Sequence, residues 1–111
     1  MKRKTLQSLF LAAASVAVCS SFHSSDLFAQ ASQVTTGERI YSDYCSNCHG
    51  EGLRNTSGGV TFDLRRLRPE DHDRFVGSVL DGKRRMPPWR GVLDADQVES
   101  IWAFIRATVD R

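Results

Sequence analysis

The last third of the chain carries the clearest helical pattern of apolar and polar positions. An apolar residue returns every three or four positions, which is the spacing of one helix face, in the set Val98, Ile101, Trp102, Ile105 and Val109. The residues expected on the opposite face are Asp96, Glu99, Ser100 and Arg106. Asp94 and Gln97 suit the N-cap and N3 positions of a capping box. The pattern predicts an amphipathic helix that begins after Asp94 and buries its apolar face.

A second apolar stripe predicts a middle helix, and its members are Phe75, Val76, Val79 and Leu80. Pro69 suits the first helical position, because its fixed φ is helical and an N–H would have no partner there. The acidic residues of the next turn lie near the positive end of the helix dipole. Gly82 is a natural stop.

The residues before position 45 predict an earlier helix. It runs from Gly37 to Tyr44 with Thr36 as its N-cap, and Ser32 to Thr35 is a short flexible lead-in. The residues on or near one face are Ile40, Tyr41 and Tyr44. Residues 50–60 are rich in glycine, asparagine and serine, which indicates a loop. Strand-like alternation is sustained nowhere, so the sequence predicts an all-α fold.

The segment Cys45-Ser46-Asn47-Cys48-His49 is the attachment signature of a c-type haem. Cys45 and Cys48 lie about one helical turn apart, so each can form a thioether to one vinyl group of the same porphyrin. His49 then lies beneath the ring, where its imidazole can bind the iron as the proximal ligand. Two alternatives are a redox CxxC pair and half of a zinc site. The first would need a βαβ context, and the second a further pair of ligands.

The first 31 residues resemble a Sec-type signal peptide. They contain a basic start at 1–4, an apolar run from Leu9 to Val18 and an A-x-A site at Ala29–Ala31. Cleavage after Ala31 would leave one domain, residues 32–111, in the periplasm, and a cut after Ala29 would change little. The apolar run is about half of the roughly 20 residues that a membrane span needs. Lipidation at Cys19 is a weaker alternative, because no small residue directly precedes it.

Signal removal changes the charge balance. The whole chain has a formal net charge of +2. Loss of Lys2, Arg3, Lys4 and Asp26 brings that charge to zero, so the basicity of the whole chain does not indicate a nucleic-acid partner. The remaining cysteines are both in the motif, which leaves no disulfide framework.

Met86 is the predicted distal iron ligand. It is the one methionine after residue 31 and lies in the segment Met86-Pro87-Pro88-Trp89, where two prolines stiffen the chain. His72 is the rival ligand, although its acidic neighbours favour a solvated face, and a core role for Met86 is the remaining alternative. A His/Met pair would leave no open coordination position on the iron, which favours electron transfer over substrate chemistry.

With these elements the chain resembles the class I cytochrome c family. The resemblance rests on Gly37-x-x-Ile40-Tyr41, the haem motif, the segment 86–89 and the aromatic C-terminal helix. It implies a small all-α fold around one covalently attached haem c, with crossing N- and C-terminal helices. It further implies that Gly37 allows a close helix approach, that Tyr41 and Trp102 pack near the crossing, and that Met86 is the distal ligand.

Three longer stretches resemble small cytochromes associated with PQQ-dependent alcohol dehydrogenases: 59–65, 75–83 and 86–89. That resemblance implies a periplasmic one-electron carrier and not an enzyme. Its donor would be a quinoprotein dehydrogenase and its acceptor would lead to a terminal oxidase. The alternatives are a haem-bearing subunit of a larger redox complex and, less favoured, a small haem peroxidase or gas sensor.

Two basic clusters remain, and their members are Arg65, Arg66 and Arg68 in the first and Lys83, Arg84, Arg85 and Arg90 in the second. Each residue is compatible with an ordinary solvated surface. The second cluster, beside Met86, is also placed to steer an acidic redox partner. A third interpretation is that some of these arginines pair with haem propionates.

Overall fold

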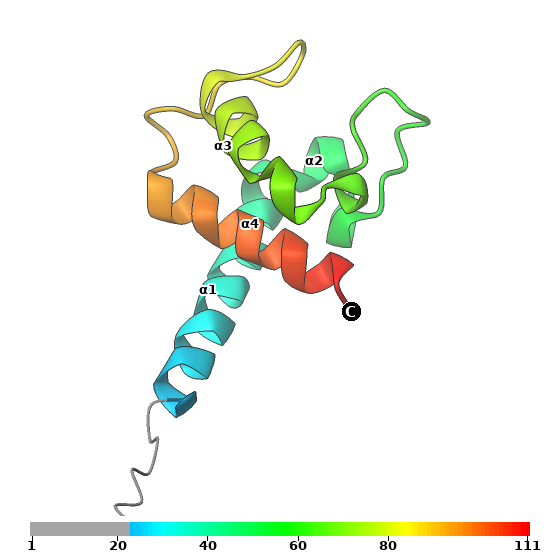
Figure 1. Cartoon of the computed structure of the whole chain (residues 1–111). Coiled ribbons are helices and arrows are strands. Elements are labelled where there is room, and N and C mark those ends of the chain that lie inside the picture. The colour runs from blue at the N-terminus through cyan, green and yellow to red at the C-terminus, as the bar shows by residue number, and fades with distance from the viewer. Residues whose placement is uncertain (1–22) are drawn as a thin grey trace, which may run out of the picture.

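The computed structural model describes residues 23–111, which form four α-helices and three short 3-10 turns (Figure 1). The helices are α1 (His23–Tyr44), α2 (Ser46–His49), α3 (His72–Asp81) and α4 (Ala95–Val109). The turns are η1 (Glu51–Leu53), η2 (Leu64–Arg66) and η3 (Pro69–Asp71). Strand pairing in residues 23–111 is limited to two isolated bridges, Lys83 with Met86 and Arg90 with Leu93. The all-α prediction is confirmed.

Helix α1 is much longer than the sequence pattern predicts. The flexible lead-in at Ser32–Thr35 and the N-cap at Thr36 are both wrong, because the helix begins at His23 and passes through them. The Thr35 hydroxyl donates to the carbonyl of Ala31 at 3.0 Å, one turn back in the helix. Residues 23–36 contain no glycine or proline and several good helix formers, so nothing local ends the helix there. The predicted basic start and apolar run of the signal peptide lie outside the described residues.

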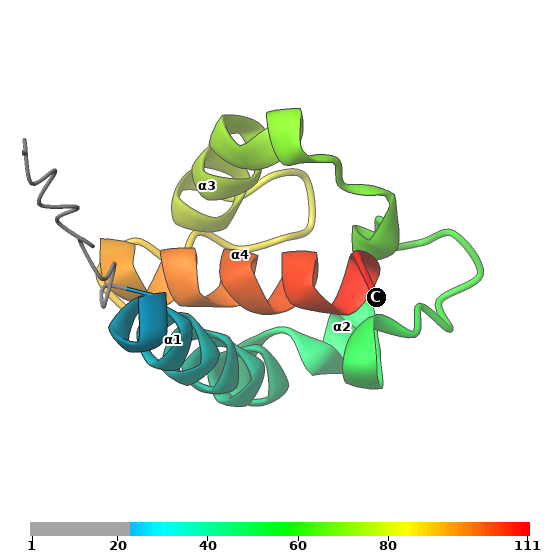
Figure 2. The same cartoon turned by 60° about the horizontal axis from the view of Figure 1, so that its bottom comes forward.

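Helices α1 and α4 cross in close contact (Figure 2). A Cβ atom added at Gly37 would lie 1.8 Å from the backbone oxygen of Ser100, so only glycine fits this crossing. Tyr41 stacks on Phe104 next to it, with ring centroids 5.3 Å apart. The close approach expected of Gly37 is therefore confirmed, whereas Trp102 packs on Phe75 of α3 and not at the crossing.

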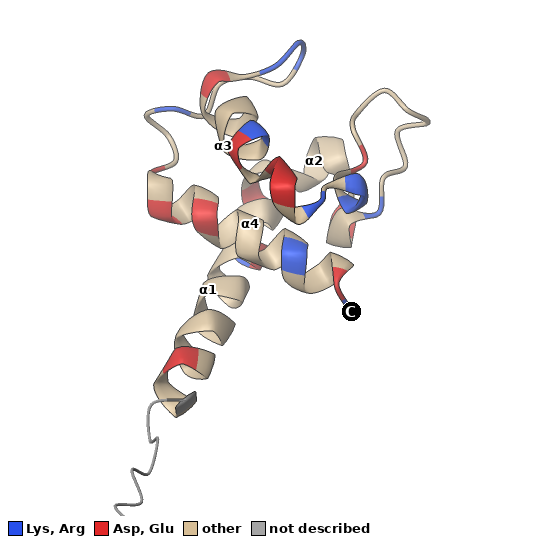
Figure 3. Cartoon of the chain, viewed as in Figure 1, with Lys and Arg blue, Asp and Glu red and all other residues tan. Residues whose placement is uncertain are grey.

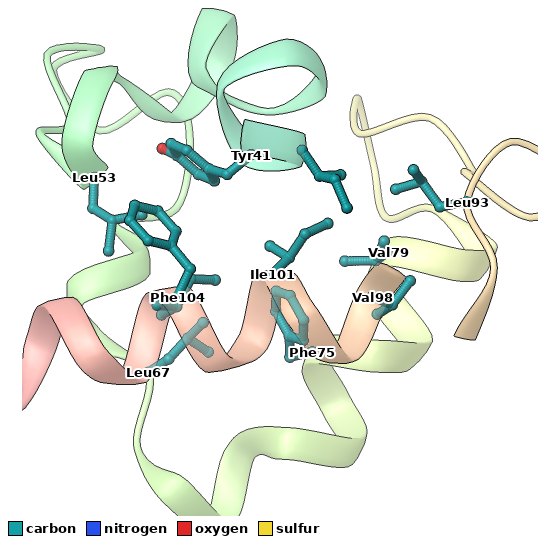
Figure 4. Close-up of a cluster of buried hydrophobic side chains, with 11 residues drawn as sticks. Tyr41, Leu53, Leu67, Phe75, Val79, Leu93, Val98, Ile101 and Phe104 are labelled. Atoms are coloured by element: carbon teal, nitrogen blue, oxygen red, sulfur yellow. The ribbon is translucent and has the colours of Figure 1, made fainter. Parts of the chain in front are cut away.

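The hydrophobic core joins α1, α3 and α4 (Figure 4). Its buried members are Ile40, Tyr41, Leu53, Leu67, Phe75, Val79, Leu93, Val98, Ile101, Phe104 and Ile105. Ser100 is also buried, contrary to its predicted place on the polar face, because the Gly37 contact brings α1 against it. Tyr44, predicted to lie on or near one face with Ile40 and Tyr41, is 42% exposed.

The ends of the later helices follow the sequence closely. The Asp94 carboxylate accepts from the backbone N–H of Gln97 at 2.8 Å, and the Gln97 side chain accepts from the N–H of Asp94 at 2.9 Å. This is the predicted capping box. Pro69 opens the η3 turn that leads into α3, and Gly82 follows the last residue of that helix. No helix within residues 23–111 combines the length and apolar character that a membrane crossing requires.

Candidate haem site

The haem motif continues directly from α1. The backbone N–H of Cys45 donates to the carbonyl of Tyr41, and the N–H of His49 donates to the carbonyl of Cys45, each at 2.9 Å. The buried Tyr41 hydroxyl donates to the carbonyl of Gly50 at 2.6 Å. Burial is the main reason that the pKa of this hydroxyl lies above its usual range. The motif is thus fixed at both ends to the helix that crosses α4.

His49 is held in one tautomer by the following loop. Its Nδ1 lies 3.0 Å from the carbonyl oxygen of Phe62. A carbonyl can only accept, so Nδ1 carries the proton and Nε2 keeps a free lone pair. Metal-binding histidines are commonly oriented by such a contact to the second ring nitrogen. The arrangement leaves Nε2 as the nitrogen suited to an iron.

The loop between His49 and Phe62 is braced by side chains. The Thr61 hydroxyl donates to the carbonyl of Cys48 at 2.8 Å. The Asn55 amide donates to the carbonyl of Thr61 at 2.9 Å, and its oxygen accepts from the backbone N–H of Ser57 at 2.9 Å. These contacts connect the segment of the second cysteine to the segment that orients His49.

The two cysteines differ in exposure, since Cys45 is partly buried and Cys48 is exposed. Burial raises the pKa of the Cys45 thiol to about 11, and the neighbouring Cys48 sulfur adds to that shift. The Cys45 sulfur is therefore neutral at neutral pH.

Met86 ends a tight turn after α3. The backbone N–H of Lys83 donates to the carbonyl of Met86, and the N–H of Met86 donates to the carbonyl of Lys83, each at 3.0 Å. Gly82 stands before the turn at φ 77°, where an added Cβ would lie 2.8 Å from the Met86 carbonyl oxygen. Glycine is required here, since other residues rarely adopt this φ and the space is already filled.

The chain after Met86 returns to α3 and reaches the haem motif. The N–H groups of Trp89 and Arg90 donate to the carbonyls of Val79 and Leu80 at 2.9 and 3.1 Å. The Trp89 ring packs edge-on against Tyr44, with centroids 5.4 Å apart. Since Tyr44 directly precedes Cys45, this contact brings the Met86 segment to the residue before the haem motif.

His72, the rival distal ligand, is engaged elsewhere. Its Nε2 lies 3.0 Å from Glu99 of α4, and its Nδ1 lies 3.1 Å from Asp73. Its ring packs edge-on against Trp102. The contact with Glu99, and then that with Asp73, raises the pKa of the imidazole above its usual value. The imidazole is therefore part of the contact between α3 and α4.

The residues around the motif fit a porphyrin. Partly buried apolar side chains pack against the core from η2, α3 and the segment after α3: Leu64, Val76, Leu80, Met86 and Trp89. A soft thioether and an imidazole with a free lone pair are suitable axial donors for haem iron. The zinc alternative finds no support in residues 23–111, where no three His, Cys, Asp or Glu side chains come close enough to hold a metal.

The basic clusters prove unlike each other. In the first, Arg65 and Arg68 are paired with neighbouring carboxylates, Asp63 and Asp71 among them. In the second, Arg90 pairs with Asp81, while residues 83–85 lie exposed in the loop that follows α3 (Figure 3). The steering role proposed for the second cluster therefore rests on residues 83–85.

Sequence reasoning missed two features of the site. One is the contact of the Phe62 carbonyl with His49, which the sequence cannot indicate because every residue carries a backbone carbonyl. The other is the contact between Tyr44 and Trp89. Two aromatic residues near the motif and near Met86 were a usable signal for that contact, but the helical pattern only groups Tyr44 with Ile40 and Tyr41.

Comparison with known proteins finds similar sequences that include quinohemoprotein alcohol dehydrogenases and cytochromes c6. Quinohemoprotein alcohol dehydrogenase ADH-IIG of Pseudomonas putida is 36% identical over 74 residues, which cover 65% of this chain and 10% of that protein. Quinohemoprotein alcohol dehydrogenase ADH IIB of the same organism is 34% identical over 76 residues, with 66% and 11% covered. Cytochrome c6 of Nostoc sp. strain PCC 7120 is 27% identical over 85 residues, with 74% and 77% covered. The chain thus spans about a tenth of the two dehydrogenases.

No solved structure matches the chain significantly. A family described as cytochrome C oxidase, cbb3-type, subunit III matches residues 32–105, which include the haem motif, the closed turn at Met86 and most of α4. The chain therefore belongs to the cytochrome c family of electron-transfer proteins, and its cofactor is covalently attached haem c.

Proposed function

We propose that residues 32–111 form a periplasmic one-electron carrier. Cys45 and Cys48 hold the haem through thioethers, and His49 and Met86 are the axial ligands of its iron. The haem supplies a metal that alternates between two oxidation states. The single observation that carries the proposal is the contact between His49 Nδ1 and the Phe62 carbonyl, which leaves Nε2 free.

The role of Met86 is supported by the closed turn and by the state of its rival. The paired backbone hydrogen bonds with Lys83 limit where the thioether can move. His72 is held by Glu99 across two helices, and its release would cost those contacts. Six-coordinate iron would leave no position for a substrate, which argues against a peroxidase or gas sensor.

The proposed donor is a periplasmic dehydrogenase, specifically a PQQ-dependent alcohol dehydrogenase, and the proposed acceptor leads to a terminal oxidase. The similarity to two quinohemoprotein alcohol dehydrogenases supports the donor. A second candidate is a haem-bearing subunit of a larger redox complex. The match to a family described as subunit III of an oxidase favours this candidate.

Export is supported by the exposure of the first part of α1. The side chains of residues 24–33 are all exposed, so cleavage after Ala31 would remove no core contact. Mass spectrometry of the protein from periplasmic extract tests this directly. We expect the mass of a chain that begins at Ser32 and carries one haem, whereas the mass of a chain that keeps residues 1–31 would contradict the proposal.

Spectra of the haem-loaded protein test the ligands. We expect a low-spin oxidised spectrum with a sulfur-to-iron charge-transfer band that Met86→Ala abolishes. The matched control is His72→Ala, which should keep the band. Loss of the band in His72→Ala with an unchanged Met86→Ala spectrum would reverse the assignment.

Rapid mixing tests the donor. Reduced PQQ-dependent alcohol dehydrogenase should reduce the oxidised carrier at a rate that depends on ionic strength, because charged residues steer the encounter. Absence of transfer would exclude this donor. Co-purification with an oxidase at fixed stoichiometry would favour the subunit instead.

A further inference from the structure

A hollow of about 460 Å³ opens between the loop after α2 and the turn that carries Met86. Its lining includes Phe62, whose carbonyl contacts His49, and Arg84, two residues before Met86. The hollow therefore lies between the segments of the two proposed iron ligands.

Two arginines reach this hollow without a carboxylate partner. Arg66 comes from η2 and Arg84 from the turn after α3. Neither forms an ion pair with another residue of the described chain. Within residues 23–111, Arg65, Arg68, Arg74, Arg90 and Arg106 do form such pairs, whereas Arg39, Arg54, Arg85 and Arg111 form none and do not line the hollow. A guanidinium presents its N–H donors in a rigid, planar arrangement that suits carboxylates. Two guanidinium groups without ion-pair partners around one hollow therefore indicate an anionic occupant.

The one carboxylate that lines the hollow is already neutralised. Asp63 accepts from Arg65 through both oxygens, from Nε at 3.0 Å and from Nη2 at 2.7 Å. These hydrogen bonds keep the pKa of Asp63 below its usual value. The formal charge left in the hollow is that of Arg66 and Arg84, two positive charges, which would balance two carboxylates.

Arg84 is also held in an unusual backbone conformation. Its φ is 55°, in the left-handed region that residues other than glycine rarely adopt. Glycine or asparagine would relax the turn between Lys83 and Met86. A strained residue whose side chain lines a hollow points to a role for that side chain.

We propose that Arg66 and Arg84 bind the two haem propionates in this hollow. The inference rests on the proposed function, because it needs the haem between His49 and Met86. Arg84 then acts as a positioning residue for Met86. Its contact with the propionate keeps the turn from Lys83 to Met86 closed, so the charge of the haem helps to hold the distal ligand.

The test compares reduction potentials of haem-loaded variants across pH. Arg84→Gln and Arg66→Gln are paired with Arg85→Gln and Arg54→Gln, which remove the same charge from exposed residues that do not line the hollow. Loss of a guanidinium raises the pKa of the propionate that it binds. The fall in potential that accompanies propionate ionisation should therefore move to higher pH in the first two variants and stay in place in the controls.

A second readout is the strength of the Met86 ligation. Arg84→Gln should lower the equilibrium constant for Met86 binding to the iron about tenfold. The loss of the charge-transfer band with increasing denaturant measures this change. Arg84→Gly removes the side chain but relaxes the backbone, so strain cannot explain its result. It should show the same shift in the pH dependence of the potential as Arg84→Gln.

Three results would overturn the proposal. The first is an Arg84→Gln variant that matches Arg85→Gln in potential and pH dependence. The second is an Arg84→Gly variant that keeps the wild-type pH dependence. The third is a wild-type potential that varies with phosphate concentration at constant ionic strength, which would show that a free anion occupies the hollow. Failure of Met86 as a ligand would appear separately in the spectrum of Met86→Ala.

Discussion

The two segments that face each other across the hollow are held in different ways. The loop after α2 depends on side chains, chiefly Asn55 and Thr61, which bridge residues distant in sequence. The turn after α3 is closed by its own backbone, through the paired hydrogen bonds of Lys83 and Met86. The first therefore depends on which side chains are present, whereas the second depends on which backbone conformations are allowed.

The largest expected effect is on the proximal side, at Gly50. This residue has φ 91°, and an added Cβ would lie 1.9 Å from the backbone oxygen of Arg54. Gly50→Ala should lower the free energy of unfolding by about 4 kcal/mol, through backbone strain and overpacking. Denaturant unfolding of the holoprotein measures it. Gly52→Ala is the control, because its φ is also positive but nothing lies within 4 Å of the new Cβ.

On the distal side, Gly82→Ala should cost about 3 kcal/mol. The added Cβ would lie 2.8 Å from the Met86 carbonyl oxygen, a smaller overlap than the 1.9 Å approach at Gly50. The charge-transfer band should weaken before the helices unfold. Gly91→Ala, with an equally positive φ and open space, should keep the band. Equal losses in the two variants would show that the turn does not position Met86.

Asn55→Ala removes side-chain hydrogen bonds from the proximal loop. We expect a loss of about 2 kcal/mol, because part-buried partners on Thr61 and Ser57 lose their contacts. Thermal unfolding of the holoprotein is the measurement. The exposed neighbour Thr56→Ala should have little effect. If the two variants were equally stable, the contrast between the two segments would be lost.

The smallest effect concerns His72, which fastens the start of α3, the helix that leads to the distal turn. Its pKa is raised in the folded chain, first by Glu99 and then by Asp73. The stabilisation is therefore complete below the usual pKa near 6.5 and is lost as pH rises through the higher folded value. As pH rises through this range, the free energy of unfolding should approach that of His72→Gln. A difference between the two proteins that stays constant with pH would contradict the assignment.

The sequence was most informative where local chemistry sets the structure. The capping box of Asp94 and Gln97 and the stop at Gly82 need only near neighbours, and both are confirmed. The length of α1 was missed, because Thr36 is a residue type that often caps a helix, whereas the helix passes through it from His23. The burial of Ser100 and the partner of Tyr44 depend on contacts between distant elements. The ligand assignments of His49 and Met86 stay predictions, although the tautomer of His49 now supports one of them.

Because α1 runs without a break from the crossing at Gly37 to Cys45, the crossing also sets the direction in which the cysteines point. Each residue of an α-helix turns the chain by about 100° and advances it by about 1.5 Å. One residue inserted between Gly37 and Cys45 would turn the haem motif to another side of the molecule. Seven inserted residues would nearly restore its direction, about 20° short of two full turns, but would move it about 10 Å along the axis. The number of residues between Gly37 and Cys45 therefore sets the direction of the haem motif, and inserting or deleting a single residue would change that direction.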